Sequence, residues 1–330
     1  MIKYFILLFI LMFNELSAQK IIVSFYNCEN FYDTIDQVKV IDEDFLPNSK
    51  KKYNSQAYEI KSNHLAKVVY GLGKMDNSKG IAIMGVVEIE NKLVLEKLIA
   101  EPLLQKYHYK YLHFDSRDQR GVDVALIYNP ANFEPYQYKP YSLTDADHFN
   151  DYATRDILYV KGRLDGQWVH ILVNHWPSRR GGAFLSNNKR IWAATVCKKI
   201  IDSVSVIDPQ AKFIVMGDFN DNPNNTSIKK LDLFNPFYTL FKKGYGSIAF
   251  RDSWSLFDQI LLSKHWEQSN NSLTNYKPII YTTPDMIETQ GKYQGYPKRT
   301  YDGDRFRGGY SDHFPVALIF KPILSGNTLK

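Results

Sequence analysis

Side chains that could hold a cation or move a proton gather where predicted strands begin or end. They are four carboxylates, two amides and two imidazoles: Glu88, Asp218, Asp258, Asp312, Asn27, Asn220, His175 and His313. In layered sheet folds, strand ends bring side chains from distant parts of the sequence to one rim. So many carboxylates at one rim are costly unless opposite charges balance them. Because carboxylate and amide oxygens are ligands for hard cations, the set predicts a Mg²⁺ or Mn²⁺ site.

Each of these residues, taken alone, also has a purely structural interpretation. The segment GDFNDNP at 217–223 has the composition of a turn. Glu88 could stabilise the positive end of the helix that follows it, and each histidine could be a hydrogen-bonded core residue. The eight residues taken together favour a functional site over these structural roles. Motifs that are absent from the sequence limit the chemistry of that site. The sequence has no CxxC pair, no HExxH, no GxxxxGKS or GxxxxGKT loop and no GxSxG elbow, so zinc sites of those types and a phosphate loop are not indicated.

Strands rich in β-branched and aromatic residues recur along the chain and must position these side chains. We predict strands at 21–27, 81–89, 110–114, 122–129, 157–164, 168–175, 212–219, 257–263 and 314–320. The spacing of apolar residues predicts helices over 57–75, 92–104 and 187–204. The segment LDGQ at 164–167 is typical of a hairpin turn. Helices mixed with hairpins favour two mixed sheets packed together and flanked by helices over a purely parallel sheet.

The composition is that of a globular protein with a sizeable core, since 44% of the 330 residues are hydrophobic and 15% are aromatic. The formal net charge of +6 leans toward anionic partners, but charge alone leaves an ordinary basic protein the better interpretation. No repeat, low-complexity block or long linker interrupts the chain, so we expect one catalytic domain over 19–322 and a polar tail over 323–330. Two cysteines make no disulfide framework, and we expect Cys28 and Cys197 to be free buried thiols.

The first residues have the pattern of a secretory signal. Lys3 precedes an apolar run from Tyr4 to Phe13, and small residues lead to a predicted cleavage after Ala18. The apolar run is too short to span a bilayer comfortably. We therefore expect residues 1–18 to be removed and the mature chain to be exported to the periplasm or the medium, as a monomer without a membrane span.

Seven stretches, in this order, resemble motifs of the endonuclease/exonuclease/phosphatase superfamily, the metal-dependent phosphodiesterases that include pancreatic-type deoxyribonucleases. They are SFYNCENFYD (24–33), GVVEIEN (85–91), RGVDVALIYN (120–129), VNHWPSRRGG (173–182), VMGDFNDNP (215–223), FDQILLS (257–263) and YSDHFPVAL (310–318). The most specific of them is VMGDFNDNP. The resemblance covers most of the mature chain and implies a four-layer α/β/β/α sandwich with its site on one rim. The strand pattern is compatible with that fold but does not specify it.

The resemblance also implies roles for the residues that would bind the metal and the water. Glu88 would be the principal Mg²⁺ ligand, with Asn27 and Asp312 in or near its shell. Asp218 would position or deprotonate the attacking water. Asn220 would hold that water and the phosphate.

Two histidines, each steered by an acid, complete the implied machinery. His313 would contact a phosphate oxygen or share in proton transfer, steered by Asp258. His175 would act on the phosphate or the leaving group, steered by Asp123. A carboxylate on one ring nitrogen fixes the tautomer of the other. Which group is the formal base stays open.

Basic residues outside the motifs are candidates for substrate binding. Arg155 resembles a family arginine that contacts phosphate, although a surface ion pair is the alternative. Ser178, Arg179 and Arg180 follow His175 and favour a phosphate-binding loop over a plain basic turn. The segment 296–313 interleaves Arg and Tyr, which suits base stacking as well as a solvated loop.

The leading hypothesis is a secreted Mg²⁺-dependent nuclease, with DNA endonuclease action favoured. The alternative within enzymes is a phosphatase or phosphodiesterase on a smaller ester, such as a sugar phosphate, an inositol phosphate or a phospholipid headgroup. A third hypothesis is a binding protein that keeps the fold without catalysis. The presence of a suitable residue at every implied catalytic position argues against that third hypothesis.

Overall fold

The computed structural model describes residues 20–145, 152–266, 273 and 275–321. The predicted signal segment, 1–18, and the predicted tail, 323–330, lie outside these residues. Among the described residues, no helix combines the length and the apolar character needed to cross a membrane. The monomeric state and the single-domain boundaries stay predictions.

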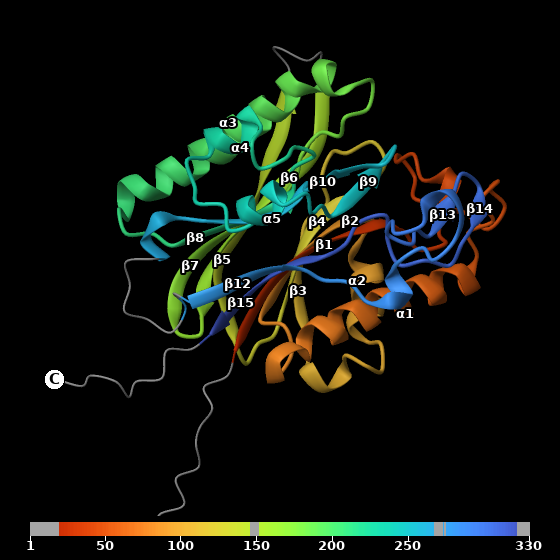
Figure 1. The fold of residues 1–330 in the computed structure, drawn as a ribbon, viewed down its shortest axis with the longest axis horizontal. Helices are drawn as coiled ribbons and strands as arrows, with labels where there is room; N and C mark the ends of the chain where they lie inside the picture. Colours follow the sequence, from red (N-terminus) through yellow and green to blue (C-terminus); the bar gives the residue numbers. More distant parts are fainter. Residues whose placement is uncertain (1–19, 146–151, 267–272, 274, 322–330) are drawn as a thin grey trace, which may run out of the picture.

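Two mixed sheets form the centre of the structure (Figure 1). The first has the order β12 (Asn275–Ile280), β15 (Val316–Lys321), β1 (Ile21–Phe31), β2 (Ile83–Ile89), β4 (Asp123–Tyr128) and β3 (Lys110–His113). The second has the order β11 (Asp258–Leu262), β8 (Phe213–Asp218), β7 (Gln167–His175), β6 (Tyr152–Leu164) and β5 (Phe133–Asp145). Strands β1 and β2 run parallel, as do β7 and β8, and the other neighbours are antiparallel.

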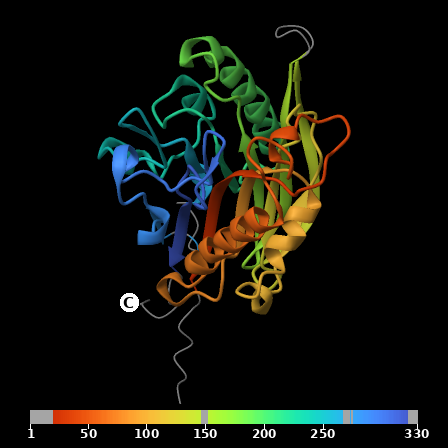
Figure 2. The same cartoon turned by 90° about the vertical axis from the view of Figure 1, so that its right-hand side faces the viewer.

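Side-chain alternation along each strand divides the core into layers. In β1, Val23 packs between the sheets with Met216 of β8, whereas Ile22 faces outward onto Leu65 of α1 (Ser55–Gly73). In β7, Leu172 faces outward onto α3 (Ala183–Ile207). Helix α2 (Lys92–Ile99) covers the first sheet beside α1, and α4 (Thr226–Lys230) accompanies α3. Figures 1 and 2 show α1 and α2 on one outer face and α3 on the other, which confirms the four-layer sandwich.

Shorter elements complete the described fold. They are α5 (Tyr238–Lys242), β9 (Ile248–Phe250), β10 (Ser253–Ser255), β13 (Tyr301–Asp302), β14 (Arg305–Phe306) and 3₁₀ turns at Glu43–Phe45, Met75–Asn77, Gln105–Tyr107, Lys264–Trp266, Pro284–Met286 and Gly291–Tyr293. The predicted LDGQ hairpin is confirmed, because β6 and β7 are joined through Asp165 and Gly166, both with positive φ. Cys28 and Cys197 are free and buried in different layers, as expected.

Candidate active site

Strand register brings the predicted residues of the second sheet to one level of its edge. His175, the last residue of β7, pairs with Asp218, the last residue of β8. Asp218 in turn faces Asp258, the first residue of β11. Parallel strands end at the same edge and an antiparallel neighbour begins there, so three side chains from distant sequence share one rim.

A β-bulge brings Glu88 to the same rim from the first sheet. Val87 and Ile89 of β2 pair with consecutive residues of β4, so Glu88 is an extra residue in the ladder. It adopts a left-handed backbone, with φ of 59°. The neighbouring strand β1 is interrupted at the same level, and the backbone N–H of its Asn30 donates to Glu88 Oε2 at 2.8 Å. Glu88 Oε1 lies 3.9 Å from His175 Nε2, so the bulge places this carboxylate against the second sheet.

His313 is held by a buried acid. Its Nδ1 lies 2.7 Å from Asp258 Oδ2, and Ser247 Oγ donates to the same oxygen at 2.5 Å. Burial alone would lower the pKa of His313, but the carboxylate of Asp258, followed by those of Asp218 and Asp312, raises it well above the ordinary value. The protonated imidazole thus directs Nε2 toward Asp218, 3.9 Å away.

Asp218 occupies the centre of the rim and is almost fully buried. Its Oδ2 accepts a hydrogen bond from Asn27 Nδ2 at 3.1 Å and lies 3.7 Å from His175 Nε2. Its Oδ1 accepts from the backbone N–H of Asn220 at 2.9 Å. Burial, opposed most by the charge of His313, raises the pKa of Asp218 to about 6. Asn220 itself donates through Nδ2 to the carbonyl of Trp176 at 3.0 Å, so its side chain fastens β7 to the segment after β8.

The expected contact between Asp123 and His175 does not occur. Asp123 Oδ2 lies 3.2 Å from Nε2 of His113, and its Oδ1 accepts from the backbone N–H of Ser116 at 2.8 Å. Asp123 opens β4 beside β3, and the last residue of β3 is His113, so the neighbouring strand supplies the imidazole that Asp123 contacts. Nδ1 of His175 is buried and has no hydrogen-bond partner among the described residues. Burial, then the charges of Arg155, Arg120 and His313, lowers the pKa of His175 well below its ordinary value.

Arg155 is 4% exposed. Its guanidinium donates to Asp118 Oδ2 at 3.1 Å and to the carbonyl of Trp176 at 2.8 Å, directly after His175. Arg120, which the sequence did not single out, shares Asp118 at 3.7 Å and keeps 38% of its side chain exposed. Arg120 is therefore better placed than Arg155 to meet a substrate. Its position just before the Gly121 turn was the only signal for it in the sequence.

The loop after His175 divides into an anchored and an exposed part. Arg179 donates to the carbonyl of Asn220 at 2.8 Å and to Asp221 Oδ1 at 3.0 Å, and its guanidinium lies 4.6 Å from the centre of the Phe257 ring. Arg179 therefore ties the loop to the site. Ser178 and Arg180, on either side of it, are exposed.

A buried lysine fastens the segment that carries Asp312. Lys61 of α1 is fully buried and donates to Thr300 Oγ1 at 2.6 Å and to the carbonyl of Tyr310 at 2.7 Å. It also lies 3.7 Å from Glu29 Oε2, which accepts from the backbone N–H of Thr300. Sequence reasoning missed this lysine because a charged residue in an amphipathic helix is normally solvated.

Asp312 itself lies beside Arg299, a residue to which the sequence analysis gave no role. Its Oδ2 is 3.0 Å from Arg299 Nη2, and its Oδ1 is 3.9 Å from His313 Nε2. Arg299 keeps 43% of its side chain exposed. The rim thus holds partly exposed arginines from two different loops, Arg120 and Arg299.

The donors at the rim fit a hard divalent cation. Glu88 Oε1 accepts no hydrogen bond from any described residue. The oxygen of Asn27 accepts from the backbone N–H of Glu29 at 2.8 Å, and Asp312 Oδ1 lies 3.9 Å from His313 Nε2, so both are candidates for places beside the metal. A cluster of Asp218, Asp258 and His313 brings one ligand atom from each within 4.8 Å of the others, but its members are already bonded to one another. Glu88 is therefore the better candidate for the principal ligand. Carboxylate and amide oxygens without thiolate are the donors that Mg²⁺ and Mn²⁺ prefer.

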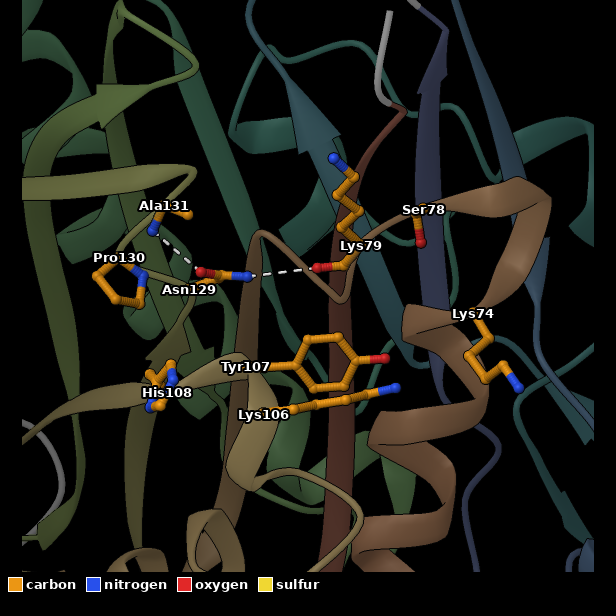
Figure 3. Close-up of a pocket in the computed structure, with 9 residues that line it drawn as sticks. All are labelled: Lys74, Ser78, Lys79, Lys106, Tyr107, His108, Asn129, Pro130 and Ala131. Carbon is orange, nitrogen blue, oxygen red and sulfur yellow. Dashed lines mark hydrogen bonds between the residues drawn. The ribbon is translucent and has the colours of Figure 1, made fainter. Parts of the chain in front are cut away.

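A separate hollow of 490 Å³ lies away from this rim (Figure 3). Asn129, which lines it, follows β4 at the end opposite to Asp123, about 20 Å along the strand. Three lysines, Lys74, Lys79 and Lys106, contribute to its lining. Its position separates it from the acids and imidazoles described above.

Known proteins share this architecture. A model of the endonuclease/exonuclease/phosphatase family matches residues 22–321. An endonuclease/exonuclease/phosphatase family protein from Bacteroides thetaiotaomicron is 15% identical, with 93% of this chain and 99% of that chain covered and a TM-score of 0.57. A mannosyl-6-phosphatase from the same organism is 14% identical, with coverages of 90% and 98% and a TM-score of 0.53. The human nocturnin catalytic domain is 15% identical, with coverages of 92% and 95% and a TM-score of 0.55. No curated protein matches the chain.

At these identities the solved structures establish the fold, and the family model establishes the relationship. Together with the acidic rim they define the class of the protein as a divalent-metal-dependent phosphoester hydrolase. The chain belongs to the endonuclease/exonuclease/phosphatase family.

Proposed function

We propose that the protein is a Mg²⁺-dependent phosphodiesterase that cuts polynucleotides, DNA in the first place, within the strand. The observation that carries the proposal is the arrangement around Asp218 Oδ2. The Nε2 atoms of His175, at the end of β7, and of His313, in the segment before β15, lie 3.7 and 3.9 Å from it. Glu88 Oε1 lies 3.9 Å from His175 Nε2. This is a carboxylate placed to orient water between two groups that can meet a phosphate.

Glu88 would be the principal ligand of the cation, with Asn27 and Asp312 beside it. When bound, Mg²⁺ or Mn²⁺ would polarise the phosphate and offset its developing negative charge. Asn27 also donates to Asp218, so it links the metal ligands to the carboxylate that orients the water. The partly exposed Arg120 and Arg299 would balance the rest of the phosphate charge.

The contacts of the remaining side chains support a catalytic role for each of them. Asp218 accepts the proton of the attacking water, and the backbone N–H of Asn220 fixes its orientation. His313, held by Asp258, donates to a phosphate oxygen. His175 acts on the phosphate or on the leaving oxygen, and Arg155 positions it through the carbonyl of Trp176.

Substrate contacts beyond the reacting phosphate are assigned to the exposed basic loops. Ser178 and Arg180 would contact the backbone of a bound strand, and Arg179 would hold their loop in place. The net charge of +6 favours a polyanion. The alternative substrate is a smaller ester, because a structural neighbour is a mannosyl-6-phosphatase.

A panel of substrates tests the proposal. Plasmid DNA, RNA, bis(p-nitrophenyl) phosphate and mannose 6-phosphate would be incubated with the purified protein and Mg²⁺, with and without EDTA. We expect EDTA-sensitive cleavage of DNA and of the dye ester. Hydrolysis of mannose 6-phosphate alone would establish the small-ester alternative, and no hydrolysis of any substrate would point to a binding protein without catalysis.

Asp218→Asn is the matching variant. It keeps the shape of the side chain but removes the negative charge, so we expect kcat to fall roughly 10²- to 10⁴-fold with the fold preserved by circular dichroism. Asp202→Asn, in the exposed ion pair with Lys198, is the control and should keep full activity. Full activity in Asp218→Asn would refute the role of Asp218.

We also propose that the chain is exported, on the pattern of its first 18 residues. N-terminal sequencing of the protein recovered from periplasm and medium would test this. A mature terminus at Gln19 is expected, and a retained Met1 in a cell-confined protein would contradict it.

A further inference from the structure

Exposed aromatic rings lie next to the segment that carries His313. They are Trp254 and Tyr293, which are 38% and 40% exposed, together with the half-buried Tyr296. We name these three residues the aromatic shelf. The rings of Trp254 and Tyr296 lie 6.0 Å apart, and those of Tyr296 and Tyr293 lie 5.6 Å apart. Through the contacts of Tyr296 with Asp252, the shelf joins the β9–β10 hairpin to the segment that precedes β13. Figure 1 shows where β9, β10 and β13 lie.

The shelf is attached to the catalytic residues by short links. Trp254 stacks on Phe314, with ring centres 6.0 Å apart and planes 14° from parallel. Phe314 immediately follows His313, and its backbone N–H donates to the carbonyl of Ser247 at 2.7 Å. Ser247 is also the residue that donates to Asp258. The position of the Trp254 ring is therefore set by the same contacts that set His313.

Hydrogen bonds make the shelf a fixed surface. Arg251 and Asp252 form the hairpin turn with φ of 49° and 60°, the left-handed pair of a tight β-turn. The hydroxyl of Tyr296 donates to Asp252 Oδ1 at 2.7 Å and accepts from the Asp252 backbone N–H at 2.6 Å. The hairpin and the neighbouring segment are thereby held together, so the rings need no rearrangement to receive a ligand.

Cations accompany the rings. The ammonium group of Lys292 lies 5.6 Å from the centre of the Tyr293 ring. Arg299, partly exposed, belongs to the segment that follows Tyr296 and contacts Asp312. Aromatic faces accompanied by cationic side chains are the pattern by which proteins hold single-stranded nucleic acid, since every base offers a face to stack. In a duplex that face is covered by neighbouring bases.

We propose that the aromatic shelf stacks the base adjacent to the scissile phosphate, so that the substrate is a single-stranded or locally unpaired polynucleotide. This inference rests on the proposed function and narrows its substrate. Trp254 is the specificity-determining residue, because it is the ring linked to His313 through Phe314.

Two single-stranded oligonucleotides of equal length and charge test the inference. One carries bases throughout, and the other carries abasic tetrahydrofuran nucleotides on both sides of the cleavage position. Wild type, Trp254→Ala and Trp254→Phe would be compared on both. Trp168→Ala is the matched control, because Trp168 is 41% exposed and lies near the start of β7, seven residues before His175 and roughly 23 Å along the strand.

We expect Trp254→Ala to raise KM for the base-containing oligonucleotide roughly 5- to 150-fold and for the abasic one less than threefold. Trp254→Phe should recover most of the loss, and Trp168→Ala should behave as wild type. Equal effects of Trp254→Ala on the two oligonucleotides, or no effect on either, would overturn the inference.

Binding measured by fluorescence anisotropy separates this inference from the proposed function. If wild type cleaves neither oligonucleotide, the proposed nuclease function fails. In that case a preference for the base-containing strand that disappears in Trp254→Ala still supports the shelf. The same affinity for both strands in wild type would overturn it.

Discussion

The imidazoles of His175 and His313, which both lie near Asp218, differ in the hydrogen-bond partner of their Nδ1 atoms. His313 has a buried carboxylate on its Nδ1, whereas the Nδ1 of His175 finds no partner among the described residues and guanidinium groups lie nearby. A buried imidazole without an acid stays neutral, and one with an acid takes up a proton. The two rings therefore differ in protonation: His313 can donate to a phosphate oxygen, whereas the neutral His175 keeps one ring nitrogen without a proton.

Asp258 is a positioning residue in this arrangement. Asp258→Asn keeps the size of the side chain but removes the charge that holds His313. We expect kcat to fall roughly 10²- to 10⁴-fold with KM within threefold, because Asp258 reaches the substrate only through His313. Steady-state kinetics on the dye ester would measure both constants. A rise in KM at constant kcat would contradict the assignment, and Asp232→Asn in an exposed ion pair is the control.

Single residues of the rim were predictable to the extent that their motifs are local. Asn27, Glu88, Asp218 and His313 lie at or near the ends of the predicted strands, where polar residues beside apolar runs are conspicuous. The pairing of Asp123 with His113 instead of His175 was not predictable, because it depends on which strands become neighbours in the sheet. Lys61 was missed for a different reason: its burial is created by contacts with a segment about 240 residues later.

At the scale of the element, the β7–β8 pair decides the geometry of the site. Gly217 stands opposite Asn174, one residue before the His175–Asp218 pair. A Cβ at Gly217 would lie 2.5 Å from the carbonyl oxygen of Asn174, which no rotamer change can relieve. The strands can approach here only because position 217 has no side chain.

Gly217→Ala should therefore affect stability and catalysis together. We expect a loss of about 1–3 kcal/mol in the free energy of unfolding and a lower kcat, because the strands must separate next to Asp218. Denaturant unfolding and kinetics would measure the two effects. Gly85→Ala is the comparison, since its Cβ would meet the flexible Met216 side chain instead of backbone, and it should cost less. A larger cost at Gly85 would contradict this account.

His170, in the middle of the same strand, gives stability a defined pH dependence. Its burial lowers its pKa to about 4, and its Nδ1 lies 2.8 Å from the hydroxyl of Tyr159. An unfolded histidine titrates near pH 6.5, so between roughly pH 6.5 and 4 the unfolded state binds the extra proton. Stability should therefore fall as the pH drops through this window, by at most about 1.4 kcal/mol per pH unit from this residue.

Urea unfolding of wild type and His170→Gln at several pH values would isolate this contribution. The variant should be less stable at pH 7 but show a shallower decline toward pH 4. Parallel curves for the two proteins would show that His170 does not titrate differently in the folded state.

The elements themselves were predicted unevenly. Strands with apolar runs, such as β2, β4 and β8, were predicted close to their observed bounds. β5 was not predicted, because Pro135 and Pro140 interrupt it. The structure places β5 at the edge of its sheet, where a missing N–H costs no ladder hydrogen bond. Edge position is a property of the whole sheet and leaves no local pattern.

At the scale of the whole molecule, the candidate metal ligands and the second-sheet acids come from different sheets. Asn27 and Glu88 belong to the first sheet, while His175 and Asp218 belong to the second. Burial of the apolar layer between the sheets brings them together. A cation held at this junction would bind only the folded chain and so stabilise it.

Mg²⁺ should therefore raise the melting temperature of the protein. At a concentration 100-fold above Kd, the linkage corresponds to about 2.7 kcal/mol, or a shift of several degrees. Differential scanning fluorimetry with Mg²⁺ and with EDTA would measure it. Glu88→Gln should abolish the shift, whereas Glu59→Gln, on the exposed surface of α1, should retain it. An undiminished shift in Glu88→Gln would place the cation elsewhere.

The bulge at Glu88 and the ends of β7 and β8 lie on facing edges of the two sheets, which pack against each other through their side chains. A small sliding movement of one sheet over the other would separate Glu88 from Asp218 without breaking the backbone hydrogen bonds within either sheet. Turnover should accordingly be lost at urea concentrations where the far-ultraviolet circular dichroism spectrum is still native. The enzymatic rate would then report the alignment of the two sheets.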